Sequence, residues 1–241
     1  MTETFINKDH LAALAASFGV TLDETALDRF DTYARLLCAW NEKINLTAIT
    51  APEEIVVKHF ADSLSLLQVA GLPQNAALID VGTGAGFPGL ALKIARPDLR
   101  VTLLDSTKKK LTVLADVSGA LGLSVELLHL RAEDAGRQPA FREQFDVAAA
   151  RAVANLRELA EYCLPFVKVG GRFLAMKSAK TDAELEEAKA AVRMLGGKTA
   201  AVHPVALYEA GARTVIEIEK VSPTPALYPR PSAKIARFPL K

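Results

Sequence analysis

The sequence predicts an α/β fold in which a mainly parallel sheet follows N-terminal helices and ends in an antiparallel hairpin. Residues 1–75 show helical periodicity only, whereas short apolar runs alternate with amphipathic stretches from residue 76 onward. Such alternation is typical of a parallel sheet with right-handed crossovers. The last two apolar runs are separated by about five residues that include Gly211, which is hairpin spacing.

The first 75 residues are predicted to form a helical cap. Helices are expected over residues 10–18, 23–40 and 52–70. In the second of these, apolar side chains recur at spacings of three and four and form one stripe: Leu27, Phe30, Ala34 and Leu37. The third begins at Pro52, which favours the first turn of a helix, and ends before Gly71.

The sheet domain is expected to span residues 76–221. Its parallel strands are predicted over residues 76–81, 101–105, 125–130, 145–150 and 172–177, the last after a turn at Gly170 and Gly171. The helices between them are predicted over residues 88–95, 108–121, 155–166 and 182–195, and the hairpin strands over 199–208 and 214–221. Because such sheets bind ligands at the carboxyl ends of their strands, the site residues are expected there.

Residues 222–241 are predicted to be a basic tail. The net charge is +1, yet acidic residues predominate in residues 1–75 and basic residues in the rest, and no acidic residue follows Glu219. The tail is rich in proline and lacks periodicity, so it is expected to become ordered only on a partner. Its charge favours a polyanion as that partner, although solubility alone also explains it.

The composition argues against a membrane or secreted protein. No apolar run reaches the about 18 residues of a transmembrane helix. Residues 1–9 lack the basic and apolar regions of a signal peptide. Cys38 and Cys163 lie in apolar, helical surroundings, as buried free thiols in a reducing compartment do. We therefore expect a cytoplasmic protein without a membrane span or a metal site.

A glycine loop follows the first predicted strand. Residues 80–89 read Asp-Val-Gly-Thr-Gly-Ala-Gly-Phe-Pro-Gly, which is a strand end, a loop and a helix start. Glycine lets the backbone turn tightly and approach a ligand closely. The G-x-G-x-x-G spacing that begins at Gly84 also occurs in dinucleotide-binding enzymes, so an NAD-dependent oxidoreductase remains an alternative.

Three features favour S-adenosylmethionine as the cofactor. Asp80, two residues before Gly82, suits the cationic amino and sulfonium groups of this ligand and would repel a pyrophosphate. Asp105 ends the second strand, where a carboxylate accepts hydrogen bonds from ribose hydroxyls. Glu133 follows the third strand, where the adenine edge is expected.

The residues after the fourth strand narrow the chemistry of methyl transfer. They read Ala150-Arg151-Ala152-Val153, and not the Asn/Asp-Pro-Pro-aromatic motif of enzymes that methylate exocyclic amines. Neither cysteine lies at a strand end, which argues against methylation of cytosine C5 through a cysteine nucleophile. What remains is a target that is already nucleophilic, such as guanine N7, for which positioning alone lowers the barrier by about 7–11 kcal/mol.

Further motifs resemble the RsmG (GidB) family, the guanine-N7 methyltransferases of bacterial small-subunit ribosomal RNA, almost end to end. The most specific are residues 40–47 and 58–64, and residues 80–89, 131–134, 150–153 and 228–230 match as well. The resemblance implies a Rossmann-like class I fold, S-adenosylmethionine as cofactor, and methylation of guanine 527 in the 530 loop of 16S rRNA. The implied partner is 16S rRNA or the 30S subunit, and the chain departs from the family in lacking a glycine after Arg230.

The resemblance also implies which residues contact the cofactor. They lie in the glycine loop, at the ends of the second and fourth strands and after the third: Gly82, Gly84, Phe87, Asp105, Ser106, Thr107, Ala132, Glu133 and Arg151. No catalytic general base is expected. Arg151 and Lys177, at the ends of the fourth and fifth strands, are candidates for positioning the reactants, although a salt bridge for Arg151 and simple exposure for Lys177 are alternatives.

Candidate RNA contacts lie on the cap, at one helix start and in the tail: Asn41, Asn45, His59, Ser63, Lys108, Lys109 and Arg230. The cap residues form either a polar rim over the target base or a hydrogen-bond network that joins cap and sheet. Residues 108–110 are lysines at a helix start, where the dipole disfavours cations, and phosphate binding would explain them. A non-catalytic RNA-binding module and a methyltransferase of protein or small molecules remain alternatives, and we expect a monomer.

Overall fold

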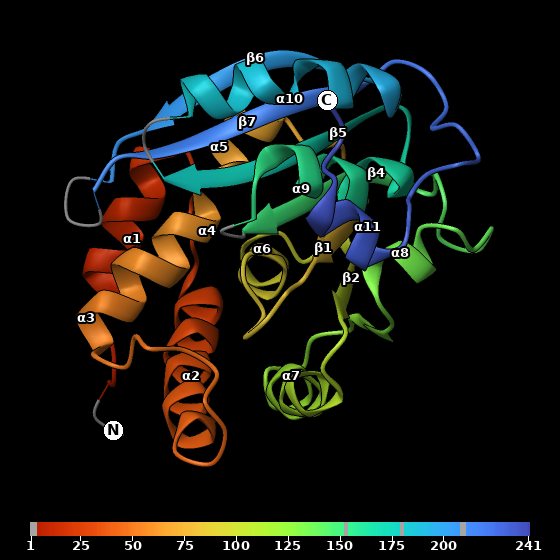
Figure 1. The fold of residues 1–241 in the computed structure, drawn as a ribbon. Coiled ribbons are helices and arrows are strands. Elements are labelled where there is room, and N and C mark those ends of the chain that lie inside the picture. Colours follow the sequence, from red (N-terminus) through yellow and green to blue (C-terminus); the bar gives the residue numbers. More distant parts are fainter. Residues whose placement is uncertain (1–3, 152–153, 179–180, 208–210) are drawn as a thin grey trace.

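The computed structural model describes residues 4–151, 154–178, 181–207 and 211–241 and contains a seven-stranded sheet (Figure 1). The strand order is β3-β2-β1-β4-β5-β7-β6. The parallel strands are β1 (Ala77–Val81), β2 (Arg100–Asp105), β3 (Glu126–His129), β4 (Phe145–Arg151) and β5 (Val167–Ser178). β7 (Arg213–Lys220) pairs antiparallel with both β5 and β6 (Gly197–Val205), so the predicted α/β fold with a closing hairpin is confirmed. Ala152, Val153 and Tyr208 of the predicted segments lie outside the described residues.

β5 differs from its prediction, because Gly170 and Gly171 lie inside the strand and not in a turn before it. The pairing of β5 with β4 shifts register between Phe145 and Val147. A Cβ on Gly171 would lie 2.6 Å from the carbonyl oxygen of Asp146, so the two backbones approach closely at this irregularity. The glycines therefore mark a bulge in a longer strand.

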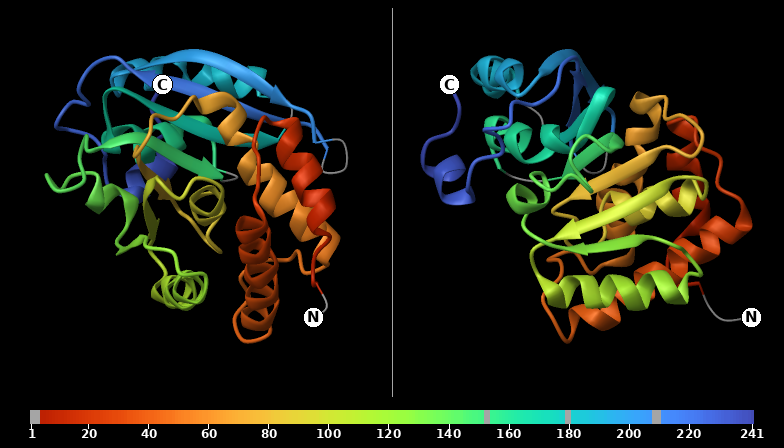
Figure 2. Two further views of the ribbon diagram at one scale, coloured as in Figure 1. Left: turned by 180° about the vertical axis from the view of Figure 1, so that it is seen from behind. Right: turned by 90° about the vertical axis from the view of Figure 1, so that its right-hand side faces the viewer.

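Helices cover both faces of the sheet. On one face, α6 (Gly89–Ala95) and α7 (Lys108–Ala120) share a continuous hydrophobic core with α1 (Lys8–Ser17) and α2 (Glu24–Asn41). The other face is covered by α8 (Ala132–Ala135), α9 (Leu156–Cys163), the short η2 (Leu164–Phe166), α10 (Asp182–Met194) and α11 (Ser232–Arg237). The right-hand view of Figure 2 shows α11 in blue on the side opposite to the red and orange N-terminal helices. Within the described ranges, no helix combines the length and apolar character needed to cross a bilayer.

The predicted helix over residues 52–70 is divided into four pieces. They are α3 (Pro52–Ile55), the π-helical η1 (Val56–Ala61), α4 (Asp62–Leu64) and α5 (Leu66–Ala70). A π-helical turn contains more residues than an α-helical turn and rotates the side chains on either side of it. It lies in the part of the cap that contacts the end of β4 through His59 and Asp62.

The C-terminal residues pack against the protein itself, so the prediction that they become ordered only on a partner is wrong. α11 contacts α9, and Ile235 and Leu240 are buried. Arg230 is also buried, and its Nε and Nη2 donate to the carboxylate of Glu161 on α9 at 2.8 and 2.7 Å. Because its guanidinium is engaged within the fold, the prediction of Arg230 as an RNA contact is wrong for this conformation.

Candidate cofactor and substrate site

The candidate site lies where the strand order of the sheet reverses. β1 has β2 as one neighbour and β4 as the other. The connections from β1 and β4 run to opposite sides of this point, and sheets of this kind bind their ligands at the carboxyl ends of the strands beside such a reversal. Val81, Asp105 and Arg151 end β1, β2 and β4 at this edge. The structure thus brings the predicted strand-end residues together.

The loop after β1 requires glycine for two different reasons. Gly82 has a φ of +74°, which side chains disfavour, and no atom lies within 4 Å of the place where its Cβ would be. At Gly89 a Cβ would lie 2.5 Å from Leu103 Cδ2 and 2.8 Å from Asp80 Cβ. Gly82 therefore leaves backbone open to a ligand, while Gly89 lets α6 begin directly against the sheet.

Asp80 anchors this loop from inside the protein. It is fully buried, and its Oδ2 accepts hydrogen bonds from Thr83 Oγ1 at 2.7 Å and from the Gly89 N–H at 2.8 Å. Burial raises the pKa of Asp80 to about 6, although these two hydrogen bonds oppose the rise. Its Oδ1 has no hydrogen-bond partner among the residues that the structure describes. Asp80 thus shapes the loop with one oxygen and keeps a second, unpaired acceptor beside it.

Asp105 holds the glycine loop and the start of α7 together. Its Oδ2 accepts from the Gly84 N–H at 3.1 Å and its Oδ1 from the Thr107 N–H at 2.8 Å. Lys110 Nζ lies 3.5 Å from Oδ2, so this lysine of the crowded helix start has a carboxylate partner. Ser106 and Thr107 are exposed next to the buried carboxylate. The arrangement fixes Asp105 at the edge where a ribose is predicted.

The predicted adenine contacts lie on α8, one strand further along the same edge. β3 pairs with β2, and α8 follows β3 directly. Ala132 begins this four-residue helix and is half-buried, and Glu133 is buried. A nucleoside whose ribose is bound at Asp105 would extend toward α8.

Arg151 joins β4 to the helical cap. Its Nη1 donates to the Lys58 carbonyl oxygen and to Asp62 Oδ2, both at 3.1 Å, and its Nη2 lies 3.2 Å from His59 Nδ1. The salt bridge that was one alternative for Arg151 is therefore present, with Asp62 as its partner. The Arg151 side chain remains 21% exposed and borders a pocket, so it is also accessible to a ligand.

Stacked aromatic rings pack the cap against the glycine loop. The Phe87 ring stacks on His59 and on Tyr33, with centroid distances of 4.5 and 5.2 Å. The Tyr33 hydroxyl donates to the Ala85 carbonyl oxygen at 2.6 Å, and the Arg151 guanidinium lies over Phe87 at 4.9 Å from its centroid. The sequence did not predict Tyr33, because a buried aromatic residue on an amphipathic helix has the pattern of ordinary core.

His59 should make the stability of the protein depend on pH. Burial, and then the charge of Arg151, lower the pKa of His59 from 6.5 to about 4. Between these values the unfolded chain binds a proton that the folded protein does not, so stability falls as pH is lowered through this window. We expect wild type to lose about 2 kcal/mol more than His59→Gln between pH 7 and pH 5. Urea unfolding at both pH values measures this difference, in which groups that titrate alike in both proteins cancel. Equal losses would show that His59 does not stay neutral in the folded protein.

A pocket of about 840 Å³ opens beside Arg151, at the ends of β4 and β5 and the start of β7. Its charged and ionisable lining residues are Lys58, His59, Asp62, Arg151, Lys177, Glu184, Glu187 and Arg213. Lys177 is not the exposed lysine of one alternative, since its Nζ bonds the Ala154 carbonyl oxygen and Glu184, each at 2.7 Å. Arg213 Nε lies 3.5 Å from Asp62 Oδ1. No sequence motif pointed to Arg213, and Asp62 entered only as part of the segment 58–64.

Two of the predicted RNA contacts form hydrogen bonds within the cap itself. Asn41 Oδ1 accepts from two backbone N–H groups of the following loop, at 2.8 and 3.0 Å. Ser63 is fully buried and donates to the His59 carbonyl oxygen at 2.6 Å, so its prediction as an RNA contact is wrong. His59 contacts Arg151 at the end of β4, as expected for a network that joins cap and sheet, whereas the hydrogen bonds of Asn41 and Ser63 stay within the cap and Asn45 is exposed.

These residues fit a nucleoside cofactor with a cationic end. The open backbone at Gly82 permits close approach, and Asp105 provides a fixed carboxylate for a ribose. The buried, unpaired Oδ1 of Asp80 places negative charge behind the loop. S-adenosylmethionine has all the matching groups: an adenine, a ribose diol, a sulfonium and an amino group.

Comparison with known proteins agrees with this fit. The profile of the family described as rRNA small subunit methyltransferase G (GidB) matches residues 26–210. The ribosomal RNA small subunit methyltransferase G of Brevibacillus brevis is 44% identical over 98% of this chain and 100% of its own length. That of Acetivibrio thermocellus is 48% identical over 94% of this chain and 93% of its own length.

Solved structures show the same fold. TrmN from Thermus thermophilus has a TM-score of 0.52 at 20% identity, over 69% of this chain and 53% of its own. A 16S rRNA (adenine(1408)-N(1))-methyltransferase from Catenulisporales acidiphilia has a TM-score of 0.50 at 16% identity, over 62% of this chain and 87% of its own. The predicted Rossmann-like methyltransferase fold is confirmed. Because the family profile covers most of the chain and its relatives align over nearly all of it, the protein belongs to the rRNA small subunit methyltransferase G family and is an S-adenosylmethionine-dependent methyltransferase.

Proposed function

We propose that this enzyme methylates N7 of a guanine in small-subunit ribosomal RNA, at position 527 in the 530 loop. The names of its relatives support ribosomal RNA of the small subunit as substrate. The atom and the position are those implied by the motifs in residues 40–47 and 58–64. We further propose that it acts as a monomer on the 30S subunit or its 16S rRNA, in the cytoplasm.

The assignment of guanine N7 as the methylated atom rests on one observation: the described carboxylates that line the pocket are all ion-paired. The pairs have N···O distances of 3.1, 2.7 and 3.1 Å: Asp62 with Arg151, Glu184 with Lys177 and Glu187 with Arg157. His59 is kept neutral by its lowered pKa and has both ring nitrogens in hydrogen-bond contact. An exocyclic amine must lose a proton in the reaction, whereas guanine N7 has a free lone pair and no proton to lose. The paired groups therefore favour N7.

On this proposal the protein acts by positioning. The bound cofactor supplies an activated methyl group. Asp105 and the glycine loop orient its nucleoside, and Arg151 marks the boundary between the cofactor crevice and the pocket for the target base. Alignment of two reactants accounts for about 7–11 kcal/mol of a barrier, which requires no acid or base.

A tritiated-methyl assay tests this proposal. Labelled S-adenosylmethionine is supplied with 30S subunits, free 16S rRNA or total protein, all from a strain that lacks the enzyme. We expect label in RNA only, and nucleoside mass spectrometry to identify it as 7-methylguanosine. Label in an exocyclic N-methyl nucleoside would contradict the N7 assignment, and label in protein would contradict the RNA substrate.

Lys108 and Lys109 should contribute to RNA affinity through phosphate contacts. Both side chains are exposed at the start of α7, beside Asp105, and have no role in the core. Each phosphate contact adds about 0.7–0.9 to the slope of log affinity against log salt. We expect the double alanine variant to lower the magnitude of that slope by about 1.4–1.8. A matched variant removes Lys198 and Lys241, which are exposed elsewhere, and should keep the wild-type slope. Equal slopes for all three proteins would exclude these contacts.

A further inference from the structure

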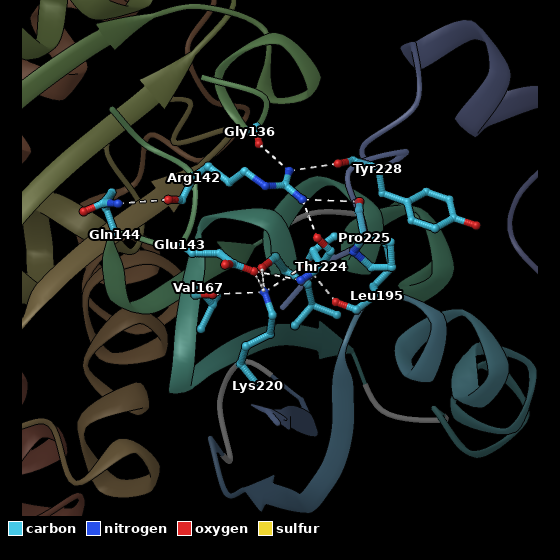
Figure 3. A network of polar contacts seen from close by, with 11 residues as sticks. Gly136, Arg142, Glu143, Gln144, Val167, Leu195, Lys220, Thr224, Pro225 and Tyr228 are labelled. Carbon is cyan, nitrogen blue, oxygen red and sulfur yellow. Dashed lines mark hydrogen bonds and ion pairs between the residues drawn. The ribbon is translucent and has the colours of Figure 1, made fainter. Parts of the chain in front are cut away.

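One arginine joins the end of α8 to residues 222–230, the C-terminal segment (Figure 3). Arg142 Nη1 donates to the Gly136 carbonyl oxygen at 3.0 Å and to the Tyr228 carbonyl oxygen at 2.9 Å. Its Nη2 donates to the carbonyl oxygens of Thr224 at 2.6 Å and Pro225 at 3.3 Å. Gly136 is the C-cap of α8. A single guanidinium therefore links the end of α8 to backbone carbonyl groups that lie more than 80 residues from Arg142 in the sequence.

The contact between α8 and the C-terminal segment continues beyond Arg142. Arg137 Nη2 donates to the Leu227 carbonyl oxygen at 3.0 Å. A Cβ on Gly136 would lie 3.3 Å from Pro229 Cγ, so Pro229 packs against the backbone at the end of α8. α8 has only four residues, too few for a helix that is stable by itself. Its position must therefore come from the elements that contact it.

The C-terminal segment is itself fixed to the sheet by a buried lysine. Lys220 is fully buried, and its Nζ donates to the carbonyl oxygens of Leu164 and Val167 and to Thr224 Oγ1, at 2.7, 3.0 and 2.8 Å. Glu143 Oε1 lies 3.1 Å from the same Nζ and accepts from the Thr224 N–H at 2.7 Å. Arg230, bound to Glu161, holds the other end of the segment on α9. The segment is thus anchored on both sides of the point where it contacts α8.

We propose that residues 222–230 are a positioning element for the adenine side of the cofactor site and act through Arg142. The inference rests on the predicted adenine contact at Ala132 and Glu133. These two residues lie on α8, whose end Arg142 binds. Arg142 does not touch the cofactor in this arrangement. It is a positioning residue whose loss lets α8 move relative to Asp105, so that the adenine and ribose contacts are no longer made together.

Binding of two ligands by full-length Arg142→Ala tests this inference. The ligands are S-adenosylmethionine and 5′-methylthioadenosine, which has the same nucleoside but lacks the amino-acid part. We expect the Kd of both to rise by the same factor, at least about fivefold, when titrated at a temperature where the protein is fully folded. In the methyl-transfer assay the KM for the cofactor should rise while kcat stays near the wild-type value. Arg142→Lys keeps the charge but reaches fewer carbonyl oxygens, and its Kd values should lie in between.

A matched variant separates positioning from stability. Arg29 is half-buried like Arg142, and its Nε donates to the Leu121 carbonyl oxygen at 3.1 Å, which joins α2 to the end of α7. Arg29→Ala should lower Tm but leave both Kd values unchanged. The inference is overturned if Arg142→Ala lowers Tm with unchanged Kd values, or if only the Kd of S-adenosylmethionine rises. If the wild-type protein bound neither ligand, the proposed cofactor site itself would be wrong, and not only the role of Arg142.

Discussion

Asp105→Ala should raise the Kd for S-adenosylmethionine by at least about 100-fold. Hydrogen bonds to a charged group contribute about 1.5–3 kcal/mol each, and a ribose diol donates two. The same carboxylate accepts from the Gly84 and Thr107 N–H groups, so its loss also loosens both sides of the site. Isothermal titration measures the affinity directly. Asp105→Asn keeps one acceptor oxygen and should fall between wild type and the alanine variant.

Asp98→Ala is the matched control for Asp105→Ala. Asp98 lies just before the other end of β2, where it pairs with Arg96 and accepts the Asn75 N–H at 2.9 Å. Its loss should cost stability without changing the affinity for the cofactor. If the two variants bind S-adenosylmethionine equally well, Asp105 does not hold the ribose.

Arg151→Ala should have the second large effect, because it leaves Asp62 without its main partner. The Asp62 carboxylate is buried, and its Oδ2 accepts from Arg151 at 3.1 Å. Removing one member of a buried pair costs about 3–5 kcal/mol, and Arg213, 3.5 Å from Asp62 Oδ1, should keep the loss near 3 kcal/mol. Methyl transfer should fall at least about 100-fold, since Arg151 also borders the pocket that we propose for the target base.

The coupling between the two residues can be measured with a double-mutant cycle in urea. Asp62→Asn removes the buried charge, so the free energy of unfolding of Arg151→Ala/Asp62→Asn should exceed that of Arg151→Ala alone. Methyl transfer should remain low in both, because neither protein has the guanidinium. Additive effects on stability would contradict the pairing. Full activity in the double variant would contradict a direct role for Arg151.

The elements that could be predicted from the sequence are those with a repeating pattern or a strand end. The predicted strand ends placed Asp105 and Arg151 at the same edge of the sheet, where the structure also has them. α8 and α11 were not predicted, since four and six residues are too few to show periodicity. The π-helical turn at residues 56–61 has no sequence pattern that separates it from an α-helix.

Long-range polar partners were beyond prediction from one sequence. Nothing near Arg230 indicates that Glu161, 69 residues away, is buried beneath it. The hydrogen bond from Tyr33 to Ala85 spans 52 residues and depends on how the cap packs on the sheet. The polar residues on the cap were assigned to RNA because their composition resembles a binding surface. Three of them, Asn41, His59 and Ser63, form hydrogen bonds within the protein, whereas Asn45 is exposed.

A crystal structure with S-adenosylhomocysteine, the demethylated cofactor, tests the central claim most directly. We expect its ribose hydroxyls on Asp105, its adenine beside Ala132 and Glu133, and its sulfur at the glycine loop facing the pocket next to Arg151. A ligand bound elsewhere would contradict the account. So would one bound in this crevice with its sulfur turned away from Arg151.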